Sequence, residues 1–187
     1  MQKKIEICSN ALLFLGHRPI SSFEEPGSGA LLAKNLWEPT YRNFLSINPW
    51  SFAKKYSGLN RLPESENYPT PNWKYQFQLP SDYIRVHTTV PVSNYELFED
   101  KLYSNNADLG IEYFYMVREE LLPPYAIRAL EYNMASVLAI PLTVDAGKAE
   151  LYAQLYDKQL QIAMSTDAQS QPAKSFVDLP TVNTRYF

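Results

Sequence analysis

Cysteine, histidine and glycine are scarce in this sequence of 187 residues, which contains one, two and six of them respectively. The single cysteine, Cys8, excludes an internal disulfide bond. Because Cys8 lies on the apolar side of a helical pattern, we expect a buried small hydrophobic residue and not a reactive thiol. Since the few glycines accompany fourteen prolines, the loops are expected to be stiff.

Long runs of one kind of residue are also missing. No apolar run is long enough to span a membrane, and the mostly polar residues 1–6 precede only a short apolar stretch, so we expect neither a membrane span nor a signal peptide. The protein is therefore expected to be made and used in a cytoplasm, or assembled there into something larger. No long run of Lys and Arg occurs and the net charge is −3, which weakens the case for tight DNA binding because that needs many phosphate contacts.

Aromatic residues, in contrast, are abundant, with 14 Tyr, nine Phe and three Trp. Aromatic side chains often lie at protein interfaces, because the ring can be buried while a polar tip stays in water. An aromatic-rich core would use the same residues equally well. A chain that is 45% hydrophobic and 20% charged is typical of a soluble globular domain, and this length suits one domain with or without extensions.

Helical periodicity marks the first part of the chain. Apolar residues recur at intervals of three and four over residues 2–15, which predicts a helix. A second helix is expected over residues 29–47, with Ser28 as its N-terminal cap. Pro39 lies inside the apolar stripe of this second helix, and an interior proline costs roughly 3 kcal/mol and kinks a helix. We therefore expect the second helix to be bent or divided into two short helices.

Helical periodicity returns near the end of the chain. Pro123 and Pro124 suit the start of a helix, where a missing N–H costs nothing. The segment Pro141-Leu142-Thr143 is expected to break this helix, and a last helix is expected over residues 144–164. Because the break is short, the two helices are predicted to form an antiparallel hairpin.

The segment between the two helical regions is predicted to be extended chain with frequent prolines. Its alternating, β-branched and aromatic stretches predict strands and one hairpin around residues 104–108. The expected strands are residues 51–59, 75–79, 83–90, 95–103 and 111–117, the last two forming the hairpin. Together they predict a small, mostly antiparallel β-sheet.

These patterns predict an α+β fold with four main helices and a small, mostly antiparallel β-sheet inserted between the N-terminal pair and the C-terminal antiparallel pair. A single domain is expected over residues 1–168. Its helices are expected within residues 2–47 and 123–165, and its β insertion over residues 50–118.

The last segment, residues 169–187, is expected to form an extended C-terminal arm. Residues 166–175 are polar and low in residues that promote order, which is typical of a spacer. Apolar residues return after this spacer and are candidates for contact with a partner. They are Phe176, Val177, Leu179, Val182, Tyr186 and Phe187.

No set of residues has the spacing that catalysis or metal binding requires. The histidines His17 and His87 have no Cys, Asp or Glu at ligand spacing. Adjacent acids do not provide the separation across a cleft that cleavage of a glycosidic bond needs, so Glu24-Glu25, Glu99-Asp100 and Glu119-Glu120 are interpreted as solvated loops or helix starts. We therefore predict that the protein is not an enzyme and has no cofactor and no metal ion.

Two weaker patterns relate to phosphate and nucleic acid. Gly27-Ser28-Gly29 precedes a helix but lacks the following lysine and the preceding strand of a phosphate-binding loop, so we interpret it as a helix entry. Lys54-Lys55 and Arg61, near Tyr56, are residue types that contact nucleic acid. A few scattered positive charges do not make a binding face.

Four segments, taken in chain order, resemble the head–tail connector proteins of short-tailed bacteriophages, a family also called tail tubular protein A or the adaptor. The resemblance covers residues 5–165, and its Asn-Pro-Trp and Leu-Pro-Ser-Asp elements are fairly specific in that order. The segments are Cys8-Ser9-Asn10-Ala11-Leu12 with Leu15-Gly16 and Pro19-Ile20, then Asn48-Pro49-Trp50-Ser51-Phe52-Ala53, then Tyr75-Gln76-Phe77-Gln78-Leu79-Pro80-Ser81-Asp82-Tyr83-Ile84-Arg85-Val86, and last Leu138-Ala139-Ile140-Pro141-Leu142-Thr143.

The resemblance implies a structural protein of the podovirus virion, located at the junction of head and tail. Family members form a ring, usually of twelve copies, beneath the portal protein at the capsid vertex. The ring extends the DNA channel and provides the attachment site for the tail nozzle. The implied partners are therefore further copies of the chain, the portal protein and the nozzle protein, while double-stranded DNA passes through during genome ejection without specific binding.

Within such a ring we expect the helices to form the wall and the sheet to project toward the tail. Trp37, Tyr41 and Trp50 are candidates for packing the helices against the sheet. The apolar residues of the C-terminal arm are candidates for contact with the portal or with a neighbouring subunit, and the arm is expected to become ordered on docking.

Two alternatives from other functional classes stay open on the residues alone. A cell-wall hydrolase carried by the virion would need two carboxylates at opposed positions in a cleft. A DNA-binding module would bind DNA in a salt-dependent way.

Overall fold

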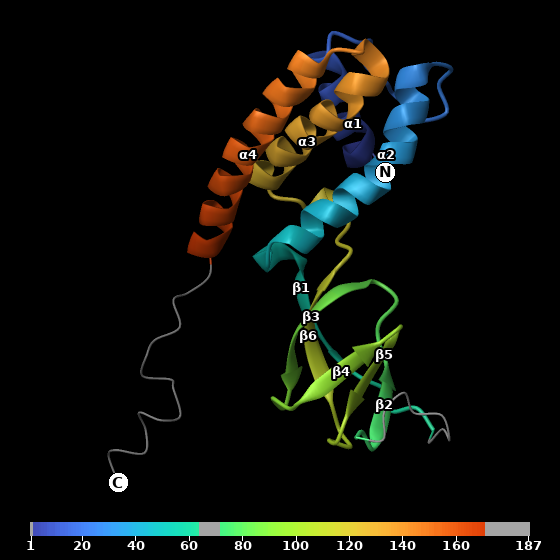
Figure 1. The fold of residues 1–187 in the computed structure, drawn as a ribbon, viewed down its shortest axis with the longest axis vertical. Coiled ribbons are helices and arrows are strands. Elements are labelled where there is room, and N and C mark those ends of the chain that lie inside the picture. The colour runs from blue at the N-terminus through green and yellow to red at the C-terminus, as the bar shows by residue number, and fades with distance from the viewer. Residues whose placement is uncertain (1, 64–71, 171–187) are drawn as a thin grey trace.

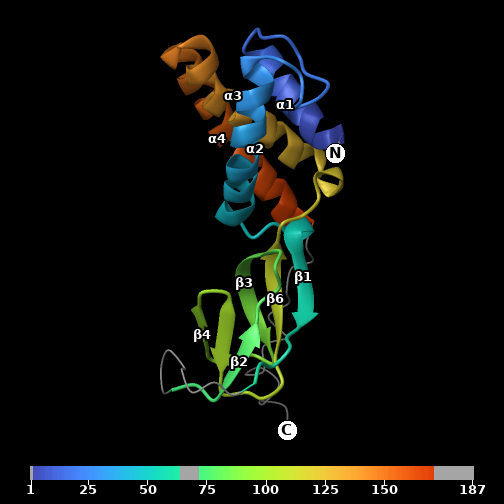
Figure 2. The ribbon, with the colours of Figure 1, turned by 90° about the vertical axis from the view of Figure 1, so that its right-hand side faces the viewer.

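The computed structural model describes residues 2–63 and 72–170 and has the predicted α+β fold. Four helices form one end of an elongated molecule, the helical part, and six strands form the other end, the sheet part (Figures 1 and 2). The helices are α1 (Gln2–Phe14), α2 (Ser28–Ile47), α3 (Pro124–Thr143) and α4 (Ala146–Gln169). The strands are β1 (Lys54–Gly58), β2 (Tyr75–Gln78), β3 (Tyr83–Val90), β4 (Tyr95–Phe98), β5 (Lys101–Ser104) and β6 (Gly110–Tyr115), and two 3-10 helices are η1 (Ser51–Ala53) and η2 (Glu119–Leu121).

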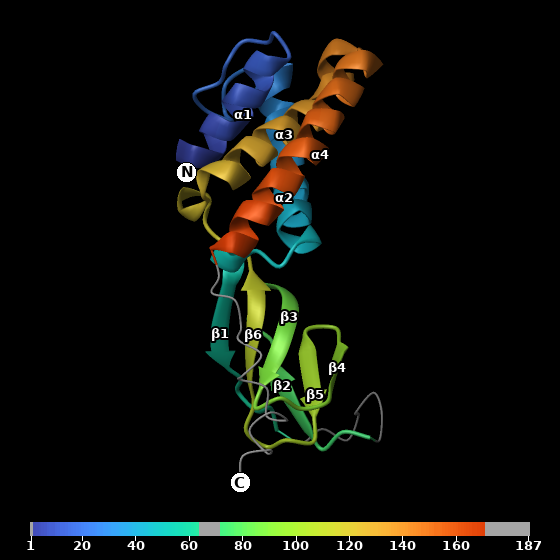
Figure 3. The ribbon, with the colours of Figure 1, turned by 90° about the vertical axis from the view of Figure 1, so that its left-hand side faces the viewer.

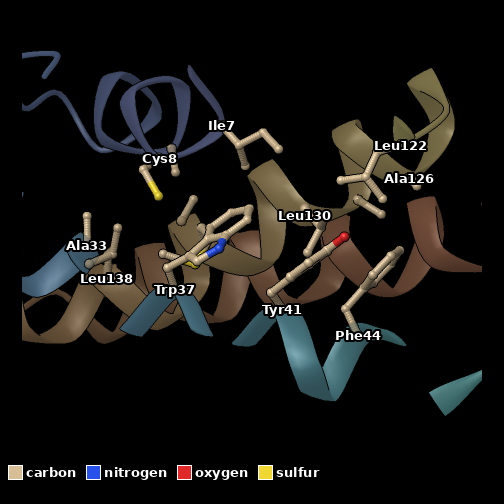
Figure 4. Packing of buried hydrophobic residues seen from close by; sticks show 14 of the residues in the cluster. Ile7, Cys8, Ala33, Trp37, Tyr41, Phe44, Leu122, Ala126, Leu130 and Leu138 are labelled. Carbon is tan, nitrogen blue, oxygen red and sulfur yellow. The ribbon is translucent and has the colours of Figure 1, made fainter. Parts of the chain in front are cut away.

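Helix α3 is the centre of the helical part, because α1, α2 and α4 all pack against it. Its buried side chains include Leu130 and Leu138, which meet Ile7 and Cys8 from α1 and Trp37 from α2 (Figure 4). Full burial of one large apolar side chain contributes about 1.5–3 kcal/mol relative to exposure. The periodic apolar faces found at both ends of the sequence therefore form one shared core.

Helix α2 remains a single helix across Pro39, and its direction changes along its length (Figure 1). Pro39 is exposed, while Trp37 and Tyr41 are buried and hold the helix to the core on either side of it. The predicted cap was wrong: Ser28 is the first helical residue and makes no capping contact. The cap position is taken by Gly27, whose φ of 146° favours glycine.

The predicted break at residues 141–143 was also wrong. Helix α3 continues through Pro141 to Thr143, because Pro141 is exposed in the last turn, where the carbonyl that loses its partner can be solvated. The chain turns at Val144, which is left-handed with a φ of 53°, and the side chain of Asp145 accepts from the N–H of Lys148 at 3.1 Å to cap α4.

Helix α4 extends to Gln169, beyond the end predicted at residue 164, and lies along α3 (Figure 3). Part of the polar segment that was interpreted as a spacer is therefore helical. The predicted arm begins inside this helix, and its apolar candidates, Phe176 to Phe187, lie outside the described residues.

The β region contains two antiparallel three-stranded sheets where one was predicted. Their orders are β1-β6-β3 and β2-β5-β4. A second apolar cluster lies among the strands and is separate from the helical core; it contains Phe77, Leu79, Val86, Leu102, Leu109, Ile111 and Tyr113. The sheet part thus has a small core of its own.

The hairpin predicted around residues 104–108 was wrong. Strand β5 pairs with β4 and β2, whereas β6 pairs with β1 and β3 in the other sheet. The hairpin that forms is β4–β5, and it turns at Glu99-Asp100 because Glu99 adopts a left-handed φ of 55°. The segment after β5 carries the chain from one sheet to the other.

The Cys8 thiol should resist alkylation in the folded protein. Cys8 is buried, as predicted, and burial raises the pKa of its thiol to about 12. At pH 8 we expect iodoacetamide to react roughly a thousandfold more slowly than with an exposed thiol, because the thiolate is the reactive form. The rate is measured by intact-mass spectrometry.

A matched control is Val92→Cys, which adds a thiol at a position that is 87% exposed. This variant should take up one label quickly in native buffer and a second only in urea. Labelling of Cys8 at the rate of the added thiol would contradict its burial.

Candidate assembly surfaces

Two chain segments join the helical part to the sheet part, and both are anchored by aromatic residues of the helical core (Figure 1). The first joint segment is residues 48–54. Within it Trp50 is fully buried, stacks on Phe44 with ring centroids 4.8 Å apart, and donates from Nε1 to the Phe44 carbonyl at 2.9 Å. The start of β1 is therefore tied to the end of α2.

The second joint segment, residues 116–123, is held by Tyr41 and Trp37 of α2. The Tyr41 hydroxyl donates to the Val117 carbonyl at 2.8 Å, and Trp37 Nε1 donates to the Glu119 carboxylate at 3.3 Å. Burial raises the pKa of Tyr41 far above its usual value. Tyr41 and Trp37 stack on each other with centroids 5.2 Å apart (Figure 4).

Trp37, Tyr41 and Trp50 were the residues proposed from the sequence for packing helices against the sheet. All three belong to the helical core cluster, and none belongs to the apolar cluster of the sheet part. Their hydrogen bonds and ring stacking tie α2 to the two joint segments, and Ile84 of β3 and Tyr115 of β6 pack against the same cluster.

A buried carboxylate near the end of α4 completes the joint. Asp167 is 2% exposed and accepts from the Ser51 N–H at 2.8 Å, from the Ser51 hydroxyl at 2.7 Å and from the Tyr125 hydroxyl at 2.7 Å. These bonds tie α4 to the first joint segment and to the start of α3. Sequence reasoning missed Asp167, because Ser51 and Tyr125 are 116 and 42 residues away and no local pattern connects them.

The outer faces of the helical part carry exposed apolar side chains. Only Ala163 and Asp167 are buried among the 24 residues of α4. On its outward side Leu151 and Ile162 are 51% and 57% exposed, and Leu31 at the start of α2 is 58% exposed. Scattered exposed apolar residues are normal, but several on one helix face mark a candidate contact surface.

The residues examined for catalysis do not come together at one place. His17 lies in the loop after α1, whereas the ring of His87 on β3 packs edge-on against Phe114 with centroids 5.5 Å apart. Glu24 pairs with Lys34 at 3.1 Å, and Glu25 accepts from the Ser21 N–H at 2.8 Å.

The other two acid pairs lie in different parts of the molecule. Glu119 accepts from Trp37 in the second joint segment, and Asp100 accepts from the side chain of Gln78 at 2.9 Å in the β4–β5 turn. The hydrogen bond from the Ser21 hydroxyl lowers the pKa of Glu25, and the hydrogen bond from the Gln78 amide lowers the pKa of Asp100. Each acid has a local role in a loop or turn.

The positive residues Lys54, Lys55 and Arg61 all have partners within the chain. Lys54 lies 2.7 Å from Glu112, and Lys55 lies 2.5 Å from Asp82 and over the ring of Tyr115. The Arg61 guanidinium stacks over a tyrosine ring with its centre 4.2 Å from the centroid. These charges are spread over the two sheets.

Within residues 2–63 and 72–170, no three His, Cys, Asp or Glu side chains lie close enough together to hold a metal ion. None of the helices in these residues is long and apolar enough to cross a membrane. A hollow of about 600 Å³ between α1, residues 20–21 and Glu120 is lined by a mixture of polar and apolar groups. No protein-family model and no curated protein matches the chain.

Replacement of Asp167 by alanine should destabilise the joint. It removes three hydrogen bonds to a buried carboxylate and leaves their donors without this partner, so we expect a loss of roughly 3 kcal/mol in the free energy of unfolding. Urea denaturation measures the loss, and amide hydrogen exchange at Ser51 should report the loosening directly.

Asp157→Ala is the matched control, since it removes an exposed aspartate from the same helix. It should change stability by no more than about 0.5 kcal/mol. If both variants have the same stability and the same exchange rate at Ser51, the carboxylate of Asp167 does not hold the joint.

Proposed function

We propose that this chain is a structural subunit of a head–tail connector ring in a short-tailed phage, and not an enzyme. The ring lies beneath the portal protein, extends the DNA channel and provides the attachment site for the tail nozzle. The proposal rests on the resemblance of residues 5–165 to the connector family, and it assigns the subunit to the virion after assembly in the host cytoplasm.

The structural observation that supports the proposal is a firmly joined two-part chain whose longest helix, α4, has few buried residues. Helix α4 packs on α3 with one face and leaves apolar residues on the other face. A subunit of a closed ring contacts two neighbours through two different patches, and permanent interfaces bury about 1,600 Å² or more in total. Outward apolar residues on the helices support a role of the helical part as the ring wall.

The sheet part then projects from the wall toward the tail. The loop after β3 lies at the end of the sheet part away from the helices, because β6 pairs with β3 and leads back to the second joint segment (Figure 2). This loop exposes Val92, and the nearby edge strand β1 exposes Tyr56. Exposed apolar side chains at this end suit the docking of a nozzle protein.

Double-stranded DNA passes through the ring without specific binding in this proposal. The subunit has a net charge of −3, and Lys54 and Lys55 are paired with acids of the same subunit. A channel wall that is neutral or negative does not hold phosphates during exit. A ring structure with a channel lined mainly by Lys and Arg would overturn this part of the proposal.

Removal of residues 171–187 should leave the subunit folded and prevent its attachment to the portal. The described fold ends at Ser170, and the hydrogen bonds of Asp167 to Ser51 and Tyr125 lie within it. The measurement is cosedimentation of the purified subunit with cognate portal rings, checked by negative-stain imaging.

The control keeps the length of the arm and replaces its six apolar candidates, Phe176, Val177, Leu179, Val182, Tyr186 and Phe187, by serine. Loss of attachment in both variants, with unchanged thermal unfolding, supports a contact made by apolar side chains. Normal attachment of the deletion variant would rule out the arm as a docking element.

A further inference from the structure

Helix α4 carries a regular row of residues on its outward side. Leu151, Leu155, Lys158 and Ile162 follow one another at intervals of four, three and four, which places them along one helix face. Leu155 is half-buried and the other three are exposed. We call these four residues the α4 row.

Helix α2 carries a second row with the same spacing. Leu31, Asn35, Glu38 and Arg42 also follow at intervals of four, three and four, and all four are exposed. We call them the α2 row. Because the residue spacing is equal, corresponding positions of the two rows lie at similar heights along their helices.

The two rows are complementary at their first and third positions. Each begins with an exposed leucine, Leu31 or Leu151. Seven residues later, roughly 10 Å along the helix, the α2 row has Glu38 and the α4 row has Lys158. Neither charge forms an ion pair inside the subunit within the described part of the chain. Opposite charges at matching heights along two helices determine the register in which the helices pack, and they contribute less to the affinity of the interface.

The placement of the helices allows one copy to present both rows to different neighbours. In Figure 1 the N-terminal half of α2 and helix α4 lie on opposite sides of the helical part, with α3 between them. Both helices run in the same direction, from the far end of the helical part toward the sheets. A rotation that relates neighbouring copies can therefore bring α4 of one beside α2 of the next with the axes running the same way.

We propose that this contact joins neighbouring subunits: the α4 row of one copy packs along the α2 row of the next, with Leu151 against Leu31 and Lys158 facing Glu38. The proposal rests on the ring proposed above and names the partner of its wall, a second copy of this chain. A two-fold contact between two α4 rows would instead place two Lys158 side chains in one seam with no acid of either row to pair them. In the unlike pairing each copy uses both rows once, and such a head-to-tail contact gives a ring when the rotation between neighbouring copies closes.

Charge reversal tests the proposal. Lys158→Glu alone and Glu38→Lys alone place like charges across the seam, so each should raise the subunit concentration at half assembly by about tenfold at low salt. The double variant restores opposite charges and should assemble within about threefold of the natural sequence. Mass photometry over a concentration series measures assembly, with and without cognate portal rings.

Asp157→Lys is the matched control. Asp157 is the exposed neighbour of Lys158 in the chain but lies about 100° around the helix from the α4 row. Its reversal should leave assembly unchanged. Thermal unfolding of all variants should coincide, because every changed side chain is exposed.

Disulfide trapping provides a second measurement. In a Cys8→Ala background, Leu31→Cys combined with Leu151→Cys should give a ladder of dimers, trimers and larger species on mild oxidation. Each single-cysteine variant should stay monomeric, since the contact joins unlike rows. A dimer from one single-cysteine variant would indicate a two-fold contact and overturn the proposal.

The proposed contact and the proposed ring are overturned by different results. If the natural protein assembles, or joins portal rings, but neither the reversals nor the cysteine pair have any effect, the ring uses other faces and only this contact is overturned. If the natural protein stays monomeric at every concentration and does not join portal rings, the proposed ring is overturned with it.

Discussion

The carboxylate of Asp167 accepts hydrogen bonds from Ser51 and Tyr125, and the relation of the two parts of the molecule depends on this arrangement. Through it the end of α4, the start of α3 and the first joint segment meet at one point. A buried charge of this kind is stabilising only when its donors are all in place, so the three segments keep one relative position. The aromatic anchors Trp50 and Tyr41 tie the first and the second joint segment, respectively, to α2.

A firm joint has a direct bearing on assembly. Suppose that the helical part forms the wall of a ring and the sheet part meets the tail. Any relative motion of the two parts would then occur in every copy, and neither contact surface would have a defined position. The buried residues of the two parts form separate apolar clusters, and Tyr115 of β6 packs against both of them. The hydrogen bonds at the joint hold the two parts in one relative position, as a shared apolar core does in a more compact domain.

The helices were predictable from the sequence because their signal is local. Apolar residues spaced three and four apart identified all four, and the burial of Cys8 followed from its place in one such face. The helix ends were predicted less well. Pro141 did not end α3, because it lies exposed in the last turn, and α4 continued past residue 164 to where Asp167 meets its distant partners.

Composition and periodicity alone determined the α+β class, the four helices and the extended segment between them, since each depends on residues a few positions apart. Only the tertiary structure decided how the strands divide into two sheets, that Glu99 turns the β4–β5 hairpin, and that Trp37, Tyr41 and Trp50 serve the joint segments. It also brought Asp167 to Ser51 and set the rows of α2 and α4 on opposite sides of α3. These features depend on contacts between residues far apart in the chain, and such contacts leave no spacing that a sequence displays.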